Sequence, residues 1–60
     1  MPVIQVYMWE GRDAETKKKL IEGLTKAFTD LGNSKESVTV ILNDIPKTNW
    51  GMKGEQVSPQ

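Results

Sequence analysis

Two apolar segments with one amphipathic helix pattern between them constrain the fold of this chain more than any other feature. Residues 3–9 are almost all β-branched, aromatic or otherwise apolar, and Gln5 alone breaks the run. Residues 38–43 also have strong β propensity. A strand, a helix and a second strand in this spacing predict a right-handed parallel β-α-β unit, in the α/β (α+β) class.

The helix pattern begins after Gly11, where Asp13 is a favourable N-cap, so we expect the first helical residue near Ala14. Apolar residues then recur at the 3.6-residue period of a helix and form one stripe. The stripe consists of Leu20, Ile21, Leu24, Ala27, Phe28 and Leu31. Gly32 and Asn33 supply a left-handed stop after about seventeen residues. Residues 34–37 are expected to form a turn or a single helical turn.

One helix covers only one face of a two-stranded sheet, and here both strands are apolar on both faces. We therefore expect another copy of the chain to cover the second face. The tail after Asp44 contains Pro46, Gly51, Gly54 and Pro59 among polar residues, which predicts a short hairpin or loop. We expect this tail to reach a neighbouring subunit.

Composition narrows the class of protein further. Sixty residues make one domain, residues 1–60, and a chain this short buries only about 60% of its unfolded surface. It has no cysteine and no histidine, so oligomerisation is the remaining means of supplementing the core. A net charge of zero argues against a nucleic-acid partner. With no signal-peptide pattern and no apolar run near the ~20 residues of a membrane span, we expect a cytoplasmic protein without a membrane partner.

Pro2 is the first candidate for chemistry. Once Met1 is removed, an amino-terminal proline is a rigid secondary amine instead of an amide. The pKa of an α-amino group is ordinarily ~7.7 to 8.0. Burial or a nearby cation lowers that pKa towards neutrality, as a general base requires. Alternatively, Pro2 only begins an edge strand, where its missing N–H has no consequence.

Arg12 and Trp50 are the other two candidates. Arg12 is the only arginine beside seven lysines, and its planar fork suits a substrate carboxylate, although a solvated loop arginine is the simpler interpretation. Trp50 lies in a polar loop and needs a partner surface, so it either walls an active site or anchors an interface. Lys47 and Lys53 flank Trp50 and would attract an anion weakly.

Three short motifs occur in a definite order along nearly the whole chain. They are Met1-Pro2 at the start of a strand, Glu10-Gly11-Arg12 before a lysine-rich amphipathic helix, and Asn49-Trp50-Gly51 followed by Gly54-Glu55. In order and spacing they resemble the 4-oxalocrotonate tautomerase (2-hydroxymuconate tautomerase) family. The resemblance implies a tautomerase (MIF-like) fold and a homo-oligomer, a hexamer built as a trimer of dimers, with a four-stranded sheet across each dimer and active sites shared between subunits.

The resemblance also implies an activity and residue roles. The family consists of isomerases that interconvert enol and keto acids without a metal or organic cofactor, here in aromatic compound degradation. Pro2 would be the catalytic base and acid, acting on a 2-hydroxydienoate or related enol acid. Arg12 would bind a substrate carboxylate. Trp50 would shield the site and keep the pKa of the proline low.

One position departs from the family pattern. The best-known members of the family carry a second arginine at the start of the second strand, which comes from a neighbouring subunit, and this chain has Thr39 at the corresponding position. The absence of this arginine removes a bidentate contact to the substrate. We therefore expect dicarboxylates to be poorer substrates and simpler enols such as phenylenolpyruvate to be better ones. A nearby lysine, the Thr39 hydroxyl, Asn43 or Asn49 would have to compensate.

Two other functions remain open. A proline-dependent hydratase or dehalogenase would need a carboxylate to activate water, and Glu10 and Glu55 are the candidates. A non-catalytic oligomeric binding module is the other alternative, and Thr39 in place of arginine is the observation that favours it.

Overall fold

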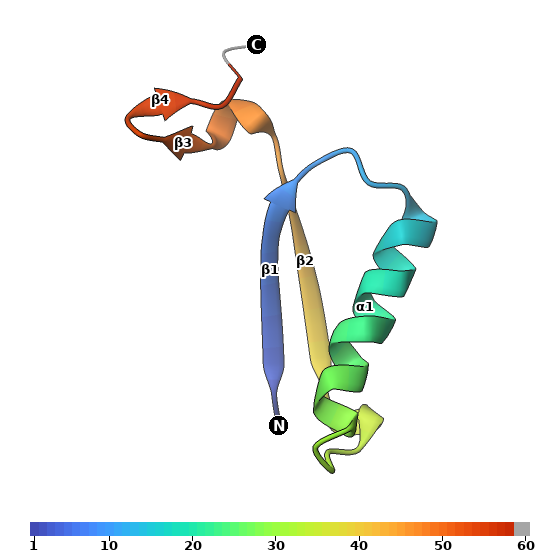
Figure 1. Ribbon diagram of the computed structural model, residues 1–60. Helices are drawn as coiled ribbons and strands as arrows, with labels where there is room; N and C mark the ends of the chain where they lie inside the picture. The colour runs from blue at the N-terminus through green and yellow to red at the C-terminus, as the bar shows by residue number, and fades with distance from the viewer. Residues whose placement is uncertain (59–60) are drawn as a thin grey trace.

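The computed structural model describes residues 1–58, which form one β-α-β unit followed by a hairpin. In chain order the elements are β1 (Val3–Trp9), α1 (Ala14–Thr29), the 3-10 turn η1 (Lys35–Ser37), β2 (Thr39–Ile45), the 3-10 turn η2 (Lys47–Asn49), β3 (Gly51–Met52) and β4 (Glu55–Gln56). β1 and β2 are parallel, α1 lies beside them, and the β3–β4 hairpin projects beyond the ends of the two strands (Figure 1). The predicted fold is therefore confirmed.

The register of the sheet decides which residues share an end. Val3 pairs with Thr39 and Trp9 pairs with Ile45. The Thr39 N–H also donates to the carbonyl of Pro2 at 3.0 Å, which extends the ladder by one residue. Because the strands are parallel, both begin at one end of the sheet and both finish at the other.

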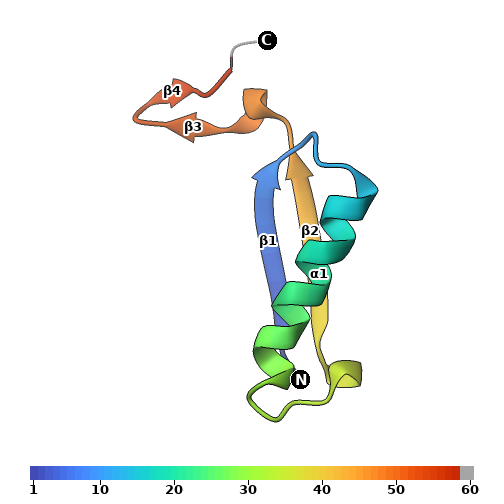
Figure 2. The same cartoon turned by 45° about the vertical axis from the view of Figure 1, so that its right-hand side comes forward.

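The even-numbered side chains of β1 face the helix, since alternate side chains point to opposite faces of a strand. Among the described residues only Met8 is buried, at 8% exposure. An ion pair between Lys17 of α1 and Asp44 of β2 joins the helix to the sheet on this side. Figure 2 shows α1 crossing in front of both strands.

The helix begins as predicted and ends earlier. The Asp13 carboxylate accepts the Thr16 N–H at 2.8 Å. Hydrogen bonding with the Thr16 side chain, and then with this backbone N–H, lowers the pKa of Asp13. α1 ends at Thr29, before Leu31, the last residue of the apolar stripe. The Leu31 N–H donates to the carbonyl of Phe28, three residues earlier, instead of four residues earlier as in an α-helix. The chain then turns at Gly32, which has a φ of 101°.

The second strand is displaced from its predicted bounds. The prediction of residues 38–43 starts one residue too early, because the Val38 N–H still bonds to Lys35 as the cap of η1. It also stops too soon, because Asp44 and Ile45 continue to pair with β1. The predicted turn at residues 34–37 is confirmed as η1.

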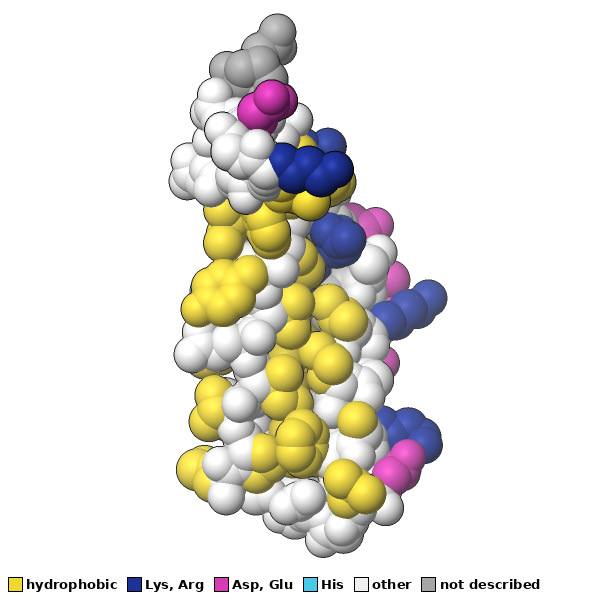
Figure 3. Space-filling view, turned by 60° about the vertical axis from the view of Figure 1, so that its left-hand side comes forward, with side chains coloured by type: hydrophobic (Ala, Val, Ile, Leu, Met, Phe, Trp, Pro, Cys, Tyr) yellow, Lys and Arg dark blue, Asp and Glu magenta, His cyan; other side chains and the backbone are white. Residues whose placement is uncertain are grey.

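The odd-numbered face of the sheet is open in the single chain. Val3 is 56% exposed and Tyr7 59%, and Ile41 of β2 is exposed beside them. No element of residues 1–58 covers this face, and its cover by another copy of the chain stays a prediction. Figure 3 shows hydrophobic side chains running along the side that carries the free edge of β1, while charged side chains gather over the helix.

The C-terminal hairpin confirms the turn predicted for the tail. Lys53 and Gly54 form a two-residue loop with φ values of 56° and 81°, the backbone of a type I′ turn. The Gln56 side-chain N–H donates to the carbonyl of Thr48 at 2.8 Å, which holds the hairpin against η2. Pro59, counted with the tail in the sequence, lies outside the described residues.

Candidate active site

The five residues predicted for the site fall into two groups at opposite ends of the sheet. Pro2 and Thr39 lie where the strands begin, and Arg12, Asn49 and Trp50 lie where they finish. From Pro2 to the end of β1 the chain spans roughly 23 Å at the rise of an extended strand. A single copy therefore does not bring Pro2 together with Arg12 and Trp50.

The beginning of the sheet holds Pro2 by its backbone. Its carbonyl oxygen accepts the Thr39 N–H, so its position is fixed by the ladder. The preceding residue, Met1, is 90% exposed, so its removal would disturb no packed side chain. Thr39 has its side chain on the open, odd-numbered face, beside Val3.

Arg12 is anchored at the other end of the sheet. Its Nη1 donates to the carbonyl of Trp9 at 3.0 Å, across the loop that joins β1 to α1. Within residues 1–58 the guanidinium makes no ion pair with an acidic side chain. A guanidinium carries five N–H donors, so most remain available for a carboxylate.

Trp9 is the partner surface that Trp50 needs. The two indole rings meet edge to face, with centroids 6.4 Å apart and planes at 90°. The Trp50 Nε1–H donates to the carbonyl of Ile45 at 3.3 Å, which fixes the ring at the end of β2. Lys47 places its Nζ over the Trp9 ring, 4.6 Å from the centroid. The end of the sheet thus carries two indoles and two cations, the second cation being Arg12.

The two asparagines differ in their surroundings. Asn49 belongs to η2, where its N–H donates to the carbonyl of Pro46 at 2.9 Å, and its side chain is exposed near Trp50. Asn43 uses its side-chain N–H to reach the carbonyl of Val6 at 3.1 Å. Asn43 therefore ties the two strands together, which weakens it as a replacement for the missing arginine.

Trp9 belongs to this cluster although its sequence context marks it only as part of an apolar strand. The signal was present in the predicted topology, because parallel strands finish at the same end of a sheet. Residues that follow shortly after β2, such as Lys47 and Trp50, must then lie near the last residue of β1.

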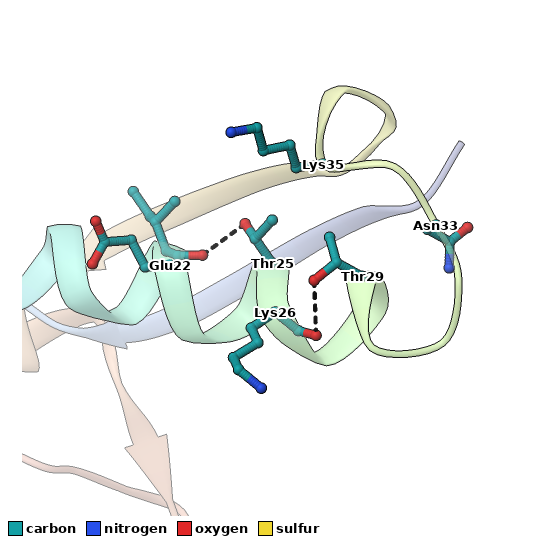
Figure 4. Close-up of a pocket in the computed structure, with 7 residues that line it drawn as sticks. Glu22, Thr25, Lys26, Thr29, Asn33 and Lys35 are labelled. Atoms are coloured by element: carbon teal, nitrogen blue, oxygen red, sulfur yellow. Dashed lines mark hydrogen bonds between the residues drawn. The ribbon is translucent and has the colours of Figure 1, made fainter.

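A hollow on the surface lies away from the predicted site residues. It is an open hollow of about 520 Å³ between α1 and η1, lined by Ile21, Glu22, Thr25, Lys26, Thr29, Asn33 and Lys35 (Figure 4). Its hydroxyls are satisfied locally: Thr25 donates to the carbonyl of Ile21 at 2.7 Å and Thr29 to that of Lys26 at 3.2 Å. None of the predicted site residues lines it.

Among residues 1–58 no group of three or more His, Cys, Asp or Glu side chains is arranged to hold a metal ion. No helix in that range is long and apolar enough to cross a bilayer.

The tautomerase family, described as "Tautomerase enzyme", matches residues 2–60. This chain belongs to that family. The 2-hydroxymuconate tautomerase of Comamonas testosteroni is 46% identical over 55 residues, which cover 90% of this chain and 87% of that protein. Such relatives are named as tautomerases, so this member is an isomerase, as the resemblance implied.

Solved structures agree with the fold. One, from a study of the 4-oxalocrotonate tautomerase isozymes of Methylibium petroleiphilum, is 42% identical with a TM-score of 0.87, covering 93% of this chain and 92% of that one. Another is a fused 4-OT described as a wild-type asymmetric trimer, 41% identical with a TM-score of 0.87. It matches 92% of this chain and 46% of its own length. The family and the tautomerase fold predicted from the three motifs are both confirmed.

Proposed function

We propose that this chain is a cofactor-independent tautomerase whose active site combines Pro2 of one copy with Arg12 and Trp50 of a second. The observation that carries the proposal is the distribution of these residues along β1. The candidate base lies at the start of the strand, and the cationic and aromatic residues lie at its end. Two copies related by a two-fold axis would bring opposite ends together.

The free edge of β1 is the natural place for that pairing. If two β1 strands pair antiparallel about Val6, residue numbers opposite each other add to twelve, so Val3 faces Trp9 and Pro2 faces Glu10 of the second copy. Pro2 would then lie next to the loop that carries Arg12. The resulting four-stranded sheet needs further copies to cover its open face. We infer a hexamer, a trimer of dimers, in which the hairpin reaches a neighbouring dimer.

The proposed reaction is a proton transfer within one substrate. The neutral Pro2 amine takes the hydroxyl proton of a 2-hydroxydienoate or related enol acid, and charge develops on the 2-oxo oxygen as the double bonds shift. The prolinium then returns a proton to carbon, so the product is an isomer of the substrate. Arg12 holds a carboxylate, and Trp50 excludes water. A nearby guanidinium and an apolar indole both favour the neutral form of the amine.

A hydratase is the second candidate, and one feature favours it. The same pairing would bring the exposed Glu10 of the second copy opposite Pro2, where a carboxylate is needed to activate water. If the wild-type protein adds water to an α,β-unsaturated acid, and Glu10→Gln loses this reaction but still ketonises enols, the hydratase activity is supported.

Cytoplasmic location and a role in aromatic compound degradation stay predictions.

The test is an ultraviolet assay of ketonisation with 2-hydroxymuconate and phenylenolpyruvate. The protein that begins at Pro2, verified by mass, is compared with its Pro2→Ala variant and with a form that retains Met1. We expect activity only in the first, because the other two lack the secondary amine. Absence of activity on both substrates from a trimmed and assembled protein would reject the proposal and favour a non-catalytic module.

A further inference from the structure

Arg12 and Lys47 both contact Trp9, the last residue of β1. Arg12 donates to the Trp9 carbonyl, and the Lys47 ammonium lies over the Trp9 ring. Trp50 contacts the same ring through its edge. Lys47 and Trp50 are also held by one turn, because the Trp50 N–H donates to the Lys47 carbonyl at 3.0 Å. Arg12, Lys47 and the two indoles therefore form one connected cluster.

The charge of this cluster is not neutralised in the described part of the chain. The ion pairs there join Lys17 with Asp44 and Lys26 with Asp30, and neither includes Arg12 or Lys47. An indole face attracts an ammonium electrostatically but does not replace an oxygen acceptor for its three N–H donors. The face restricts where the Lys47 ammonium lies and leaves its donors free, which prepares it to bind an anion.

We propose that Lys47 is a second carboxylate-binding residue of this site and makes it selective for dicarboxylate enols over monocarboxylates. The inference rests on the proposed tautomerase function and adds the substrate class. Arg12 would hold the carboxylate at one end of the substrate and Lys47 the carboxylate at the other. Lys47 thus supplies the positive charge that Thr39 lacks, and it reverses the substrate preference expected from Thr39 alone.

The alternative is that Lys47 only packs on Trp9. Cation–π contacts at exposed positions are common and stabilise a fold without binding any ligand. In that case Lys47→Met, which keeps the length and apolar stem of the side chain, would affect dicarboxylate and monocarboxylate substrates equally. A difference between the effects of Lys47→Met on the two substrates therefore distinguishes carboxylate binding by Lys47 from packing alone.

The experiment compares kcat and KM for 2-hydroxymuconate, a dicarboxylate, with those for phenylenolpyruvate, a monocarboxylate. For Lys47→Met we expect kcat/KM on 2-hydroxymuconate to fall about tenfold, mainly through KM, as for loss of a charged hydrogen bond. The value on phenylenolpyruvate should stay within about twofold. Lys47→Arg should restore most of the loss. Lys19→Met, on the exposed side of α1, is the matched control and should change kcat/KM for neither substrate.

A binding measurement keeps the inference testable without turnover. Trp9 and Trp50 are the only tryptophans, so their fluorescence reports on this cluster. We expect cis,cis-muconate to quench it at about tenfold lower concentration than a monocarboxylate of similar length, and Lys47→Met to remove that preference. Equal binding of both acids by the wild-type protein, or an equal loss of activity on both substrates, would overturn the role of Lys47. Inactivity of the wild-type protein combined with selective muconate binding would reject only the proposed reaction.

Discussion

The indole of Trp9 meets the indole of Trp50 edge to face, at 6.4 Å between ring centroids. This contact joins the last residue of β1 to the segment that follows β2. Because Arg12 hydrogen-bonds to the Trp9 backbone, the aromatic pair and the guanidinium are held by the same residue. Substitution of either tryptophan should therefore change the activity that we attribute to Pro2 and Arg12.

Replacing Trp50 tests whether the ring keeps the site dry. In Trp50→Ala, water would reach the Pro2 amine and favour its charged form, so its pKa should rise. A smaller fraction of the amine is then neutral at pH 7, and the rising limb of kcat/KM against pH should move to higher pH. Trp50→Phe, which keeps an aromatic wall, should leave the limb nearly in place. An unchanged limb in Trp50→Ala would mean that the ring serves only packing.

Replacing Arg12 tests its role in binding the substrate. Loss of a charge-assisted hydrogen bond is worth about 1.5–3 kcal/mol, so Arg12→Gln should lower kcat/KM roughly 10- to 100-fold. Arg12→Lys should recover only part of this, because a lysine presents no planar fork. Steady-state kinetics at a fixed pH measure both. Wild-type kinetics in Arg12→Gln would identify Arg12 as a solvated loop residue.

We expect a charged substitution on the open face of the sheet to dissociate the oligomer. Val3 is more than half exposed in one copy, and we expect it to be buried in the assembly. Val3→Glu would place a charge in that interface and remove apolar burial worth about 1.5–3 kcal/mol per copy. Light scattering should then report a smaller species, with activity lost. Lys18→Glu, on the exposed side of α1, is the control that should keep the wild-type mass.

The cap of α1 predicts a dependence of stability on acid. The pKa of Asp13 is lowered because the side chain of Thr16, and then its backbone N–H, hydrogen-bond to the charged carboxylate. This stabilisation is present above the unfolded pKa of the carboxyl and is lost as pH falls through the lowered native pKa. Thermal unfolding should show a lower Tm for Asp13→Ala at pH 7. In Asp13→Asn, which keeps the cap without an ionisable group, the acid-side fall in Tm should be smaller than in the wild type.

Local structure was predictable where neighbouring residues decide it. β1 has its predicted bounds because the apolar run is long, and α1 starts after Asp13 because the cap is a local interaction. The end of β2 was missed because Asp44 is polar and suggests a loop. In the structure its charge is paired with Lys17, so the strand continues.

The arrangement of the candidate site residues does not follow from local sequence. The parallel register places Pro2 at the opposite end of the sheet from Arg12 and Trp50, and their roles stay predictions. Trp9 and Lys47 join the cluster only through that register, which depends on contacts between distant parts of the chain. Thr39 lies beside Pro2, at the opposite end of the sheet from Arg12.

A complementation experiment tests the shared active site most directly. Pro2→Ala and Arg12→Ala chains, each expected to be strongly impaired alone, are unfolded together, refolded and assayed for ketonisation of 2-hydroxymuconate. If Pro2 works with Arg12 of a second copy, activity should return to about a quarter of wild type, because half of the randomly formed dimers are mixed and one of their two sites is intact. If both residues act within one chain, no mixed dimer has an intact site, and a refolded mixture that stays inactive would contradict the account.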